Sequence, residues 1–553
     1  MVKYFSQTIL LLSFLLASNL SFCQFTQQDT LRGSITPERA WWDVLHYTVN
    51  VTPDYTTKTI KGASEIEFKV LKEGHTMQID LQQPLVVDSI FIYEDMGKFT
   101  RIPMSNVKRE ENVYFIKTPG YKPGTVNIIV VYYHGKPRQA INPPWDGGWI
   151  WKKDEKGNPW MSVACQGLGA SVWYPCKDHQ SDEPDNGASL TIIAPDTLTA
   201  VGNGRLTNKK SNNDGTTSWT WEVKSPINNY NIIPYIGKYA HWHDEYNGEK
   251  GKLDLDYWVL DYNLEKAKQQ FGRDVKPMLQ CFEDWFGPYP FYEDGYKLVE
   301  SPHLGMEHQS AVAYGNKYMN GYLGRDLSGS GWGKDWDYII IHESGHEWFG
   351  NNITTNDIAD MWVHEGFTNY SEPLFVECKY GKKAADEYCQ GLRRNIDNDK
   401  PVIGPYGVNK EGSGDMYAKG ANLLHTIRQI IGDAKFKEIL RGLNKDFYHK
   451  TTSSKEVEAC FSKRSGKDLS KIFHQYLRTV KIPVLEYKIK GSSFSYRWTN
   501  CVKGFNMPLR ISSGGTERWI SPKEEWQTQK MTDGFKEGSF RTDPNFYIEV
   551  KKR

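Results

Sequence analysis

The sequence predicts an α+β protein of several domains, with β-rich segments at both ends and a mostly helical segment between them. Three observations lead to this prediction. Alternating polar and apolar residues recur in short stretches through the first part of the chain, helical spacing replaces them from residue 264 to about residue 480, and alternation returns from residue 481. The 553 residues are enough for three or four domains.

Residues 1–23 are expected to be a secretion signal. Lys3 supplies its positive charge, and residues 9–17 form an apolar stretch that is too short to cross a bilayer. Phe22 stands where a lipoprotein signal requires a small residue, so ordinary cleavage after Cys23 is preferred to lipid attachment. The mature protein is therefore expected to be periplasmic or secreted, without stable membrane insertion.

Residues 24–240 are expected to form an N-terminal β-domain. Residues 45–51, 63–70 and 77–81 alternate in polarity and are separated by turn residues. Short strands at this spacing predict a twisted sheet or sandwich.

Residues 241–480 are expected to form the helical domain, and residues 481–553 a small β-domain. Val275, Leu279, Phe282 and Phe286 mark an amphipathic helix, which the Gly-Pro-Tyr-Pro sequence at 287–290 ends. In the last segment, residues 494–498 alternate again and turns of the Gly-Gly and Asp-Gly type follow.

The charge balance argues against nucleic-acid and membrane-surface partners, and the cysteine content argues against a disulfide framework. The chain has 68 Lys and Arg against 67 Asp and Glu, with no long basic run, so no nucleic-acid or membrane-surface partner is expected. Seven cysteines remain after signal cleavage, so at least one thiol is free, and their scatter shows no disulfide framework. Cys378 and Cys389 could pair. The oligomeric state is not indicated.

Residues 342–346 read His-Glu-Ser-Gly-His, and Glu365 follows nineteen positions after the second histidine. On a helix, His342 and His346 lie one turn apart on one face, where both imidazoles can reach one ion. Two imidazoles and a carboxylate suit Zn²⁺ and leave its fourth position open for water. This arrangement indicates a catalytic metal site.

The surrounding sequence favours the metal site over a chance match. Apolar residues precede and follow the motif, and Gly350-Asn351 closes it, which predicts a buried helix of about fourteen residues. Burying two histidines and two glutamates there without a metal would cost free energy that no interaction compensates.

At this point the chain resembles the zinc aminopeptidases of the aminopeptidase N and leukotriene-A hydrolase type, whose pattern is H-E-x-x-H, eighteen residues, then Glu. The resemblance implies that His342, His346 and Glu365 hold one zinc ion per chain and that Glu343 is the base that deprotonates the zinc-bound water. It also implies a saddle-shaped N-terminal β-domain and a thermolysin-like catalytic domain. Members often add a large helical domain that caps the cleft, for which no room is expected here.

Residues 303–309 resemble the exopeptidase motif of this family, whose Gly305-Met306-Glu307 portion matches. By that resemblance, Gly305, Met306 and Glu307 bind substrate, and Glu307 holds its free α-ammonium. A carboxylate near the zinc can pair with a cationic N-terminus, which an internal peptide bond lacks. The alternative is a solvated loop carboxylate. His308 stands where the family most often has Asn.

Residues 415–421 resemble the Y-x-K-G motif of the family at the start of a helix that runs to Gly432. Tyr417 would then face the cleft and stabilise the developing oxyanion, a contribution of about 2.7 to 4 kcal/mol. Packing alone is the other interpretation of this tyrosine.

Gln166, nine residues before Pro175, matches a family segment whose glutamine reaches the cleft from the N-terminal domain. Ser171 replaces the family's basic residue, and an insertion precedes Asp182. A simple β-turn role for Gln166 remains open.

Together these residues predict a zinc-dependent aminopeptidase that acts on peptides with a free N-terminus. Glu343 and Tyr417 are its expected catalytic residues. Epoxide hydrolysis, endopeptidase activity and non-catalytic peptide binding are the alternatives, and the last is disfavoured because every expected ligand and the base are present. The preferred first residue is not predicted.

Overall fold

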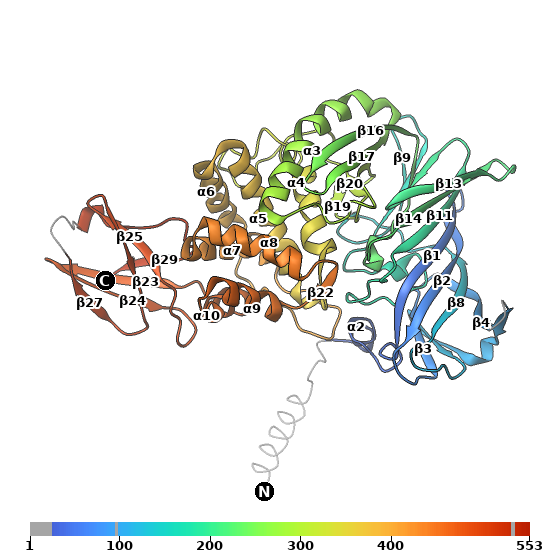
Figure 1. Ribbon diagram of the computed structural model, residues 1–553, viewed down its shortest axis with the longest axis horizontal. Coiled ribbons are helices and arrows are strands. Elements are labelled where there is room, and N and C mark those ends of the chain that lie inside the picture. The colour runs from blue at the N-terminus through green and yellow to red at the C-terminus, as the bar shows by residue number, and fades with distance from the viewer. Residues whose placement is uncertain (1–24, 95–97, 532–536) are drawn as a thin grey trace, which may run out of the picture.

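A computed structural model describes residues 25–94, 98–531 and 537–553. Within these residues the chain forms a β-rich N-terminal part, a central helical part and a β-rich C-terminal part, arranged in that order along the long axis of the molecule (Figure 1). The predicted α+β fold class is confirmed. The expected signal segment lies outside the described residues. No helix in the described part of the chain is long and apolar enough to cross a membrane.

The N-terminal part is built on three sheets. Its tryptophan-rich core includes Trp41, Trp42 and Trp149, which are at most 2% exposed. A short helix, α2 (Gln27–Gly33), precedes the sheets. The largest sheet has the order β13 (Arg205–Ser211), β14 (Thr216–Val223), β11 (Ala188–Pro195), β1 (Trp42–Asp54), β2 (Thr59–Val70), β8 (Val126–Gly135), β4 (Val86–Glu94), β5 (Lys98–Ile102).

The two smaller sheets complete this part. Only β1 and β11 pair in parallel in the large sheet, so its other neighbours run antiparallel. One small sheet has the order β12 (Thr199–Val201), β15 (Tyr235–Gly237), β10 (Pro159–Ala164), β9 (Gly148–Lys153), and the other β3 (Thr76–Asp80), β7 (Val113–Lys117), β6 (Val107–Glu110).

A five-stranded sheet opens the central part and joins it to the N-terminal part. Val299 and Met306, from two of its strands, belong to the N-terminal hydrophobic core. The two parts are therefore packed together beside the segment that carries Glu307. The sheet has the order β16 (Tyr239–Gly248), β17 (Gly251–Leu260), β18 (Tyr296–Glu300), β20 (Val312–Tyr314), β19 (Gly305–Met306).

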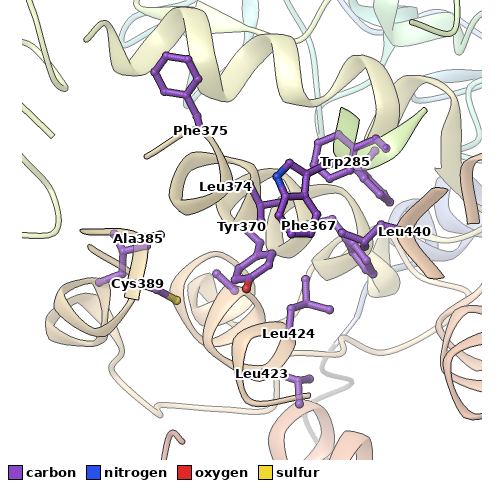
Figure 2. Close-up of a cluster of buried hydrophobic side chains, with 14 of the residues drawn as sticks. Trp285, Phe367, Tyr370, Leu374, Phe375, Ala385, Cys389, Leu423, Leu424 and Leu440 are labelled. Atoms are coloured by element: carbon purple, nitrogen blue, oxygen red, sulfur yellow. The ribbon is translucent and has the colours of Figure 1, made fainter. Parts of the chain in front are cut away.

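Helices make up the rest of the central part, and α5 lies at their centre. Phe367, Tyr370 and Leu374 of this helix are buried among side chains of its neighbours (Figure 2). The helices are α3 (Leu264–Phe286), α4 (Tyr338–Gly345), α5 (Trp362–Tyr380), α6 (Lys382–Gly391), α7 (Ala418–Ile431), α8 (Asp433–Asp446), α9 (Ser454–Ser465) and α10 (Ser470–Arg478), with a parallel strand pair of β21 (Ile353–Thr355) and β22 (Lys450–Thr452).

The C-terminal part consists of two small sheets. Leu485, Phe494 and Trp498 belong to the same hydrophobic core as the central helices, so this part is packed onto them. One sheet has the order β27 (Gln527–Lys530), β24 (Ser493–Thr499), β23 (Val484–Lys490), β29 (Glu549–Lys552), and the other β26 (Thr516–Ile520), β25 (Leu509–Ser513), β28 (Arg541–Thr542).

The expected free thiol is present, but the possible pair of Cys378 with Cys389 does not form. Cys281 of α3 forms a disulfide with Cys378 of α5, with 6.1 Å between their Cα atoms, and Cys389 is a buried free thiol. The bonded cysteines are 97 residues apart, and only the packing of α3 against α5 brings them together.

Candidate active site

Three predicted metal ligands lie together in a buried site. His342, His346 and Glu365 are 5%, 1% and 2% exposed. Glu365 Oε2 lies 3.7 Å from His342 Nε2 and 3.3 Å from His346 Nε2. One ligand atom from each residue lies within 4.8 Å of the others, which is close enough for a single ion.

The helix that carries the histidines is shorter than predicted. Asp337 caps it by accepting hydrogen bonds from the backbone N–H groups of Ile339 and Ile340, and α4 ends at Gly345 rather than near residue 350. Beyond His346 the chain turns tightly, with Gly350 at a φ of 129°. A residue with a side chain rarely adopts this conformation, so the glycine permits the turn.

The other nitrogen of each imidazole is already occupied. His342 Nδ1 donates to Glu372 Oε1 at 2.9 Å, and His346 Nδ1 donates to the Phe349 carbonyl at 3.0 Å, which the tight turn has brought back to the ring. Hydrogen bonds of this kind fix the tautomer and leave Nε2 free to bind a metal. No sequence motif indicated Glu372, although it follows Glu365 by seven residues and so lies on the same face of α5.

The residues present fit a zinc ion. Glu365 Oε2 is buried and, among the residues that the structure describes, has no hydrogen-bond partner, although the free Nε2 atoms of both histidines face it. An unsatisfied buried carboxylate oxygen is costly, and a cation between it and the two imidazoles would remove that cost. Two neutral imidazoles and one carboxylate are a donor set typical of catalytic zinc.

Glu343 lies beside the ligands at the same cavity. A Cβ atom at residue 305 would come within 2.7 Å of Glu343 Oε1, so only glycine at this position leaves room for the carboxylate. Burial raises the pKa of Glu343 to about 7.

Glu307 follows β19 and lies at the end of the cavity next to the N-terminal part. It is 2% exposed, and its Oε1 accepts hydrogen bonds from Gln166 Nε2 at 2.6 Å and from the Tyr230 hydroxyl at 2.9 Å. Gln166 Nε2 also lies 3.3 Å from Glu365 Oε1. The structure therefore places Gln166 beside Glu307 and a metal ligand, and adds Tyr230, which no sequence motif indicated.

Tyr417 caps the start of α7 and lines the cavity, with its ring centroid 6.1 Å from that of His342. A close approach of two helices positions it. A Cβ atom at Gly420 of α7 would come within 2.9 Å of the Cα atom of Gly366 of α5. Burial, reinforced by the charge of Glu365, raises the pKa of Tyr417 well above its ordinary value, so the phenol keeps its proton.

The cavity that joins these groups has a volume of about 390 Å³. The two departures from the family motif do not line it. His308 is fully buried and hydrogen-bonded to the Tyr235 hydroxyl, and Ser171 is buried against Asp178 and Gln82. The residues that do line it are Pro144, Trp145, Gln166, Leu304, Gly305, Met306, Glu307, Tyr322, Tyr338, Ile339, His342, Glu343, His346, Glu365, Glu411, Met416 and Tyr417.

This fold and this site together define a zinc metallopeptidase, with a β-rich domain packed against a helical domain that supplies two histidines and a glutamate. The chain belongs to the M1 peptidase family. Residues 44–230 match the Peptidase M1 N-terminal domain, residues 273–476 match the Peptidase family M1 domain, and together these matches cover more than half of the chain.

The chain is similar to named aminopeptidases over much of its length. It is 20% identical to Aminopeptidase M1 of Arabidopsis thaliana over 519 residues, which cover 90% of this chain and 56% of that protein. It is 23% identical to Aminopeptidase N of Lactococcus lactis subsp. lactis over 340 residues, 57% of this chain and 38% of that protein. The chain thus spans about half the length of these relatives.

A solved structure shares the fold. It is a mutant M1 zinc metallopeptidase from Deinococcus radiodurans bound to a Tyr-Ser-Ala substrate, with a TM-score of 0.67 and 20% identity. The match covers 81% of this chain and 96% of the Deinococcus chain, so the two proteins share the fold over nearly the whole of the Deinococcus protein.

Proposed function

We propose that this protein is a zinc-dependent aminopeptidase that hydrolyses the N-terminal peptide bond of peptides. One observation carries the proposal. Ligand atoms of Glu307, Glu343 and His346 lie within 4.8 Å of one another, so a buried carboxylate stands beside the metal ligands and the base. A free α-ammonium bound by Glu307 would place the first peptide carbonyl next to Glu343.

Glu343 supplies the acid–base chemistry in this proposal. Zinc, when bound, is a Lewis acid that lowers the pKa of a water molecule and polarises a carbonyl group. Glu343 takes a proton from the attacking water and passes it to the leaving amine. A carboxylate beside the attacking water is suited to both tasks.

Tyr417 and Glu307 have complementary tasks. The protonated phenol of Tyr417 can donate a hydrogen bond to the oxyanion that develops from the carbonyl oxygen. Glu307, with Oε1 held by Gln166 and Tyr230, keeps Oε2 for the α-ammonium. Met306 and Gly305 line the same cavity and complete the expected substrate contacts.

The test compares an unblocked peptide with its N-acetylated twin. We expect the purified protein loaded with one zinc ion per chain to release the first amino acid from the unblocked peptide only, because acetylation removes the charge that Glu307 binds. Equal cleavage of both peptides would instead indicate an endopeptidase. Epoxide hydrolysis is tested separately with an epoxide substrate.

The base assignment has its own control. Glu343→Gln should lower kcat by about 10²- to 10⁴-fold while the zinc content stays at one ion per chain. Activity above about one per cent in a zinc-replete sample would contradict Glu343 as the base. Retained zinc shows that the loss reflects chemistry rather than a damaged site.

We also propose a periplasmic or secreted location, with residues 1–23 as a cleaved signal. The charged and apolar pattern of that segment supports the proposal, and so does the Cys281–Cys378 disulfide, since such bonds persist in oxidising compartments. Detection of the N-terminus at Gln24 in protein recovered from outside the cytoplasm tests it.

The proposed domain bounds are 24–240, 241–480 and 481–553. The end of α10 at Arg478 and the start of β23 at Val484 support the last boundary.

A further inference from the structure

Glu411 lies on the wall of the active-site cavity, and neither the metal site nor the proposed chemistry uses it. It is partly buried, and within the described residues its carboxylate makes no hydrogen bond or ion pair. Its Oε1 would lie 3.4 Å from a Cβ atom built on Gly167, next to Gln166. Glu411 therefore stands beside the substrate-binding end of the cavity. Lys400 and Lys410 are near enough to lower its pKa, but neither forms an ion pair with it in the described residues.

The cavity that Glu411 lines carries an excess of acidic side chains. Four glutamates line the cavity, Glu307, Glu343, Glu365 and Glu411, and none of its described lining residues is Lys or Arg. A zinc ion would offset Glu365, and a substrate α-ammonium would offset Glu307. Burial, and then the charges of Glu365 and Glu307, raise the pKa of Glu411, and the positive charges of Lys400 and Lys410 offset this rise only in part.

The loop that carries Glu411 is held in place by the N-terminal part of the chain. The backbone N–H of Asn409 donates to the Asp29 carbonyl at 3.0 Å, and its Nδ2 donates to the Gly167 carbonyl at 3.2 Å. A Cβ atom at Gly412 would come within 1.8 Å of the Val402 carbonyl oxygen, so the loop closes tightly on itself. Glu411 is thus presented on a fixed support, as a recognition group requires.

We propose that Glu411 recognises a positively charged side chain on the first residue of the substrate, so that the enzyme prefers peptides that begin with Arg or Lys. The inference rests on the proposed aminopeptidase function. Glu307 is already placed for the α-ammonium, and the cavity of about 390 Å³ leaves room for a side chain beside it. Trp145 lines the same cavity, and an aromatic side chain can attract a cation.

The test compares wild type with Glu411→Gln, which keeps the shape of the side chain and removes its charge. Unblocked peptides that differ only in their first residue, Arg, Lys, Met or Leu, are the substrates. We expect wild type to favour Arg and Lys, and the variant to lose about 10- to 100-fold in kcat/KM for these two, with changes below about threefold for Met and Leu. Glu525→Gln, at an exposed site in the C-terminal part, is the matched control and should change nothing.

Three outcomes would overturn the inference. An equal loss for all four peptides would mean that Glu411 acts on the α-ammonium or on the site as a whole. An unchanged profile would mean that it binds nothing, and a wild-type preference for Met or Leu would contradict the proposed selectivity. Failure of wild type to cleave any of the peptides would instead refute the proposed function, which keeps the two failures distinct. Equal zinc content and equal unfolding midpoints exclude a folding defect in the variant.

Discussion

Gln166 donates a hydrogen bond from Nε2 to Glu307 Oε1 at 2.6 Å, across 141 residues of sequence. The bond joins the N-terminal part of the chain to the catalytic part at the point where the substrate N-terminus is expected to bind. It also fixes which oxygen of Glu307 stays available. The N-terminal part is therefore a component of the proposed active site, beyond its role in packing.

Replacing Gln166 by alanine should weaken substrate binding. A hydrogen bond to a charged group contributes about 1.5 to 3 kcal/mol, so we expect Gln166→Ala to raise KM for unblocked peptides by about tenfold or more, with a smaller effect on kcat. Steady-state kinetics on one unblocked peptide measure this. An unchanged KM would show that the bond to Glu307 does not serve substrate binding.

Replacing Tyr417 by phenylalanine should affect the chemical step. Loss of one oxyanion donor costs about 2.7 to 4 kcal/mol, so kcat for Tyr417→Phe should fall by about 10²- to 10³-fold while KM changes little. The ring remains, so packing against His342 is retained. A variant with wild-type kcat would reduce Tyr417 to a packing residue, which was the alternative in the sequence.

Glu372 should tune the affinity for zinc without binding it. Its carboxylate accepts from His342 Nδ1 at 2.9 Å and from the Tyr388 hydroxyl at 2.8 Å. Loss of such a partner typically lowers metal affinity by 10- to 100-fold, which we expect for Glu372→Gln. Competition with a chelator of known affinity measures the change. Equal zinc affinity in variant and wild type would contradict the role assigned to this glutamate.

The metal site was predictable from the sequence because its geometry is local. His342 and His346 lie one helical turn apart, so their spacing alone places both imidazoles on one face. Glu365 lies on the next helix and was assigned by the resemblance to the family motif. The remaining contacts depend on tertiary packing. Tyr230 and Glu411 occur in segments without a regular pattern, and only the assembled fold brings them to the cavity.

The same distinction explains why the cysteine pairing stayed open in the sequence and why the metal-binding helix was predicted too long. Cys281 and Cys378 lie on different helices, and no sequence pattern reports how α3 and α5 are packed. The predicted fourteen-residue helix relied on apolar residues that continue past His346. The chain instead turns at Gly350 so that the Phe349 carbonyl can hold the His346 ring. There the hydrogen bond between His346 and the Phe349 carbonyl replaces the helical conformation that the local sequence favours.

The Cys281–Cys378 disulfide should contribute substantially to stability. It joins two core helices at positions 97 residues apart in the sequence. A native disulfide of this kind typically contributes about 2 to 4 kcal/mol to the free energy of unfolding. We expect a reducing agent to lower the urea unfolding midpoint of wild type. The double variant Cys281→Ala/Cys378→Ala should start from the lower midpoint and show no response to reductant. A midpoint of wild type that is insensitive to full reduction would contradict this prediction.

His425 should make stability depend on pH. It lies between α5 and the C-terminal part, with Nδ1 3.0 Å from the Tyr370 hydroxyl and Nε2 3.1 Å from Asn545 Oδ1, and burial lowers its pKa from 6.5 to about 3. Between these two values the unfolded chain binds a proton that the folded chain does not, so the free energy of unfolding is highest above pH 6.5 and falls as the pH drops toward 3.

His425 is expected to lower the free energy of unfolding by about 1.4 kcal/mol per pH unit, or about 2 kcal/mol between pH 6.5 and pH 5. Urea unfolding at pH 7 and pH 5 measures the loss in wild type. His425→Gln keeps a polar side chain that does not titrate, so its loss over the same range should be smaller by about 2 kcal/mol. Equal losses in the two proteins would show that His425 is not held neutral in the folded state.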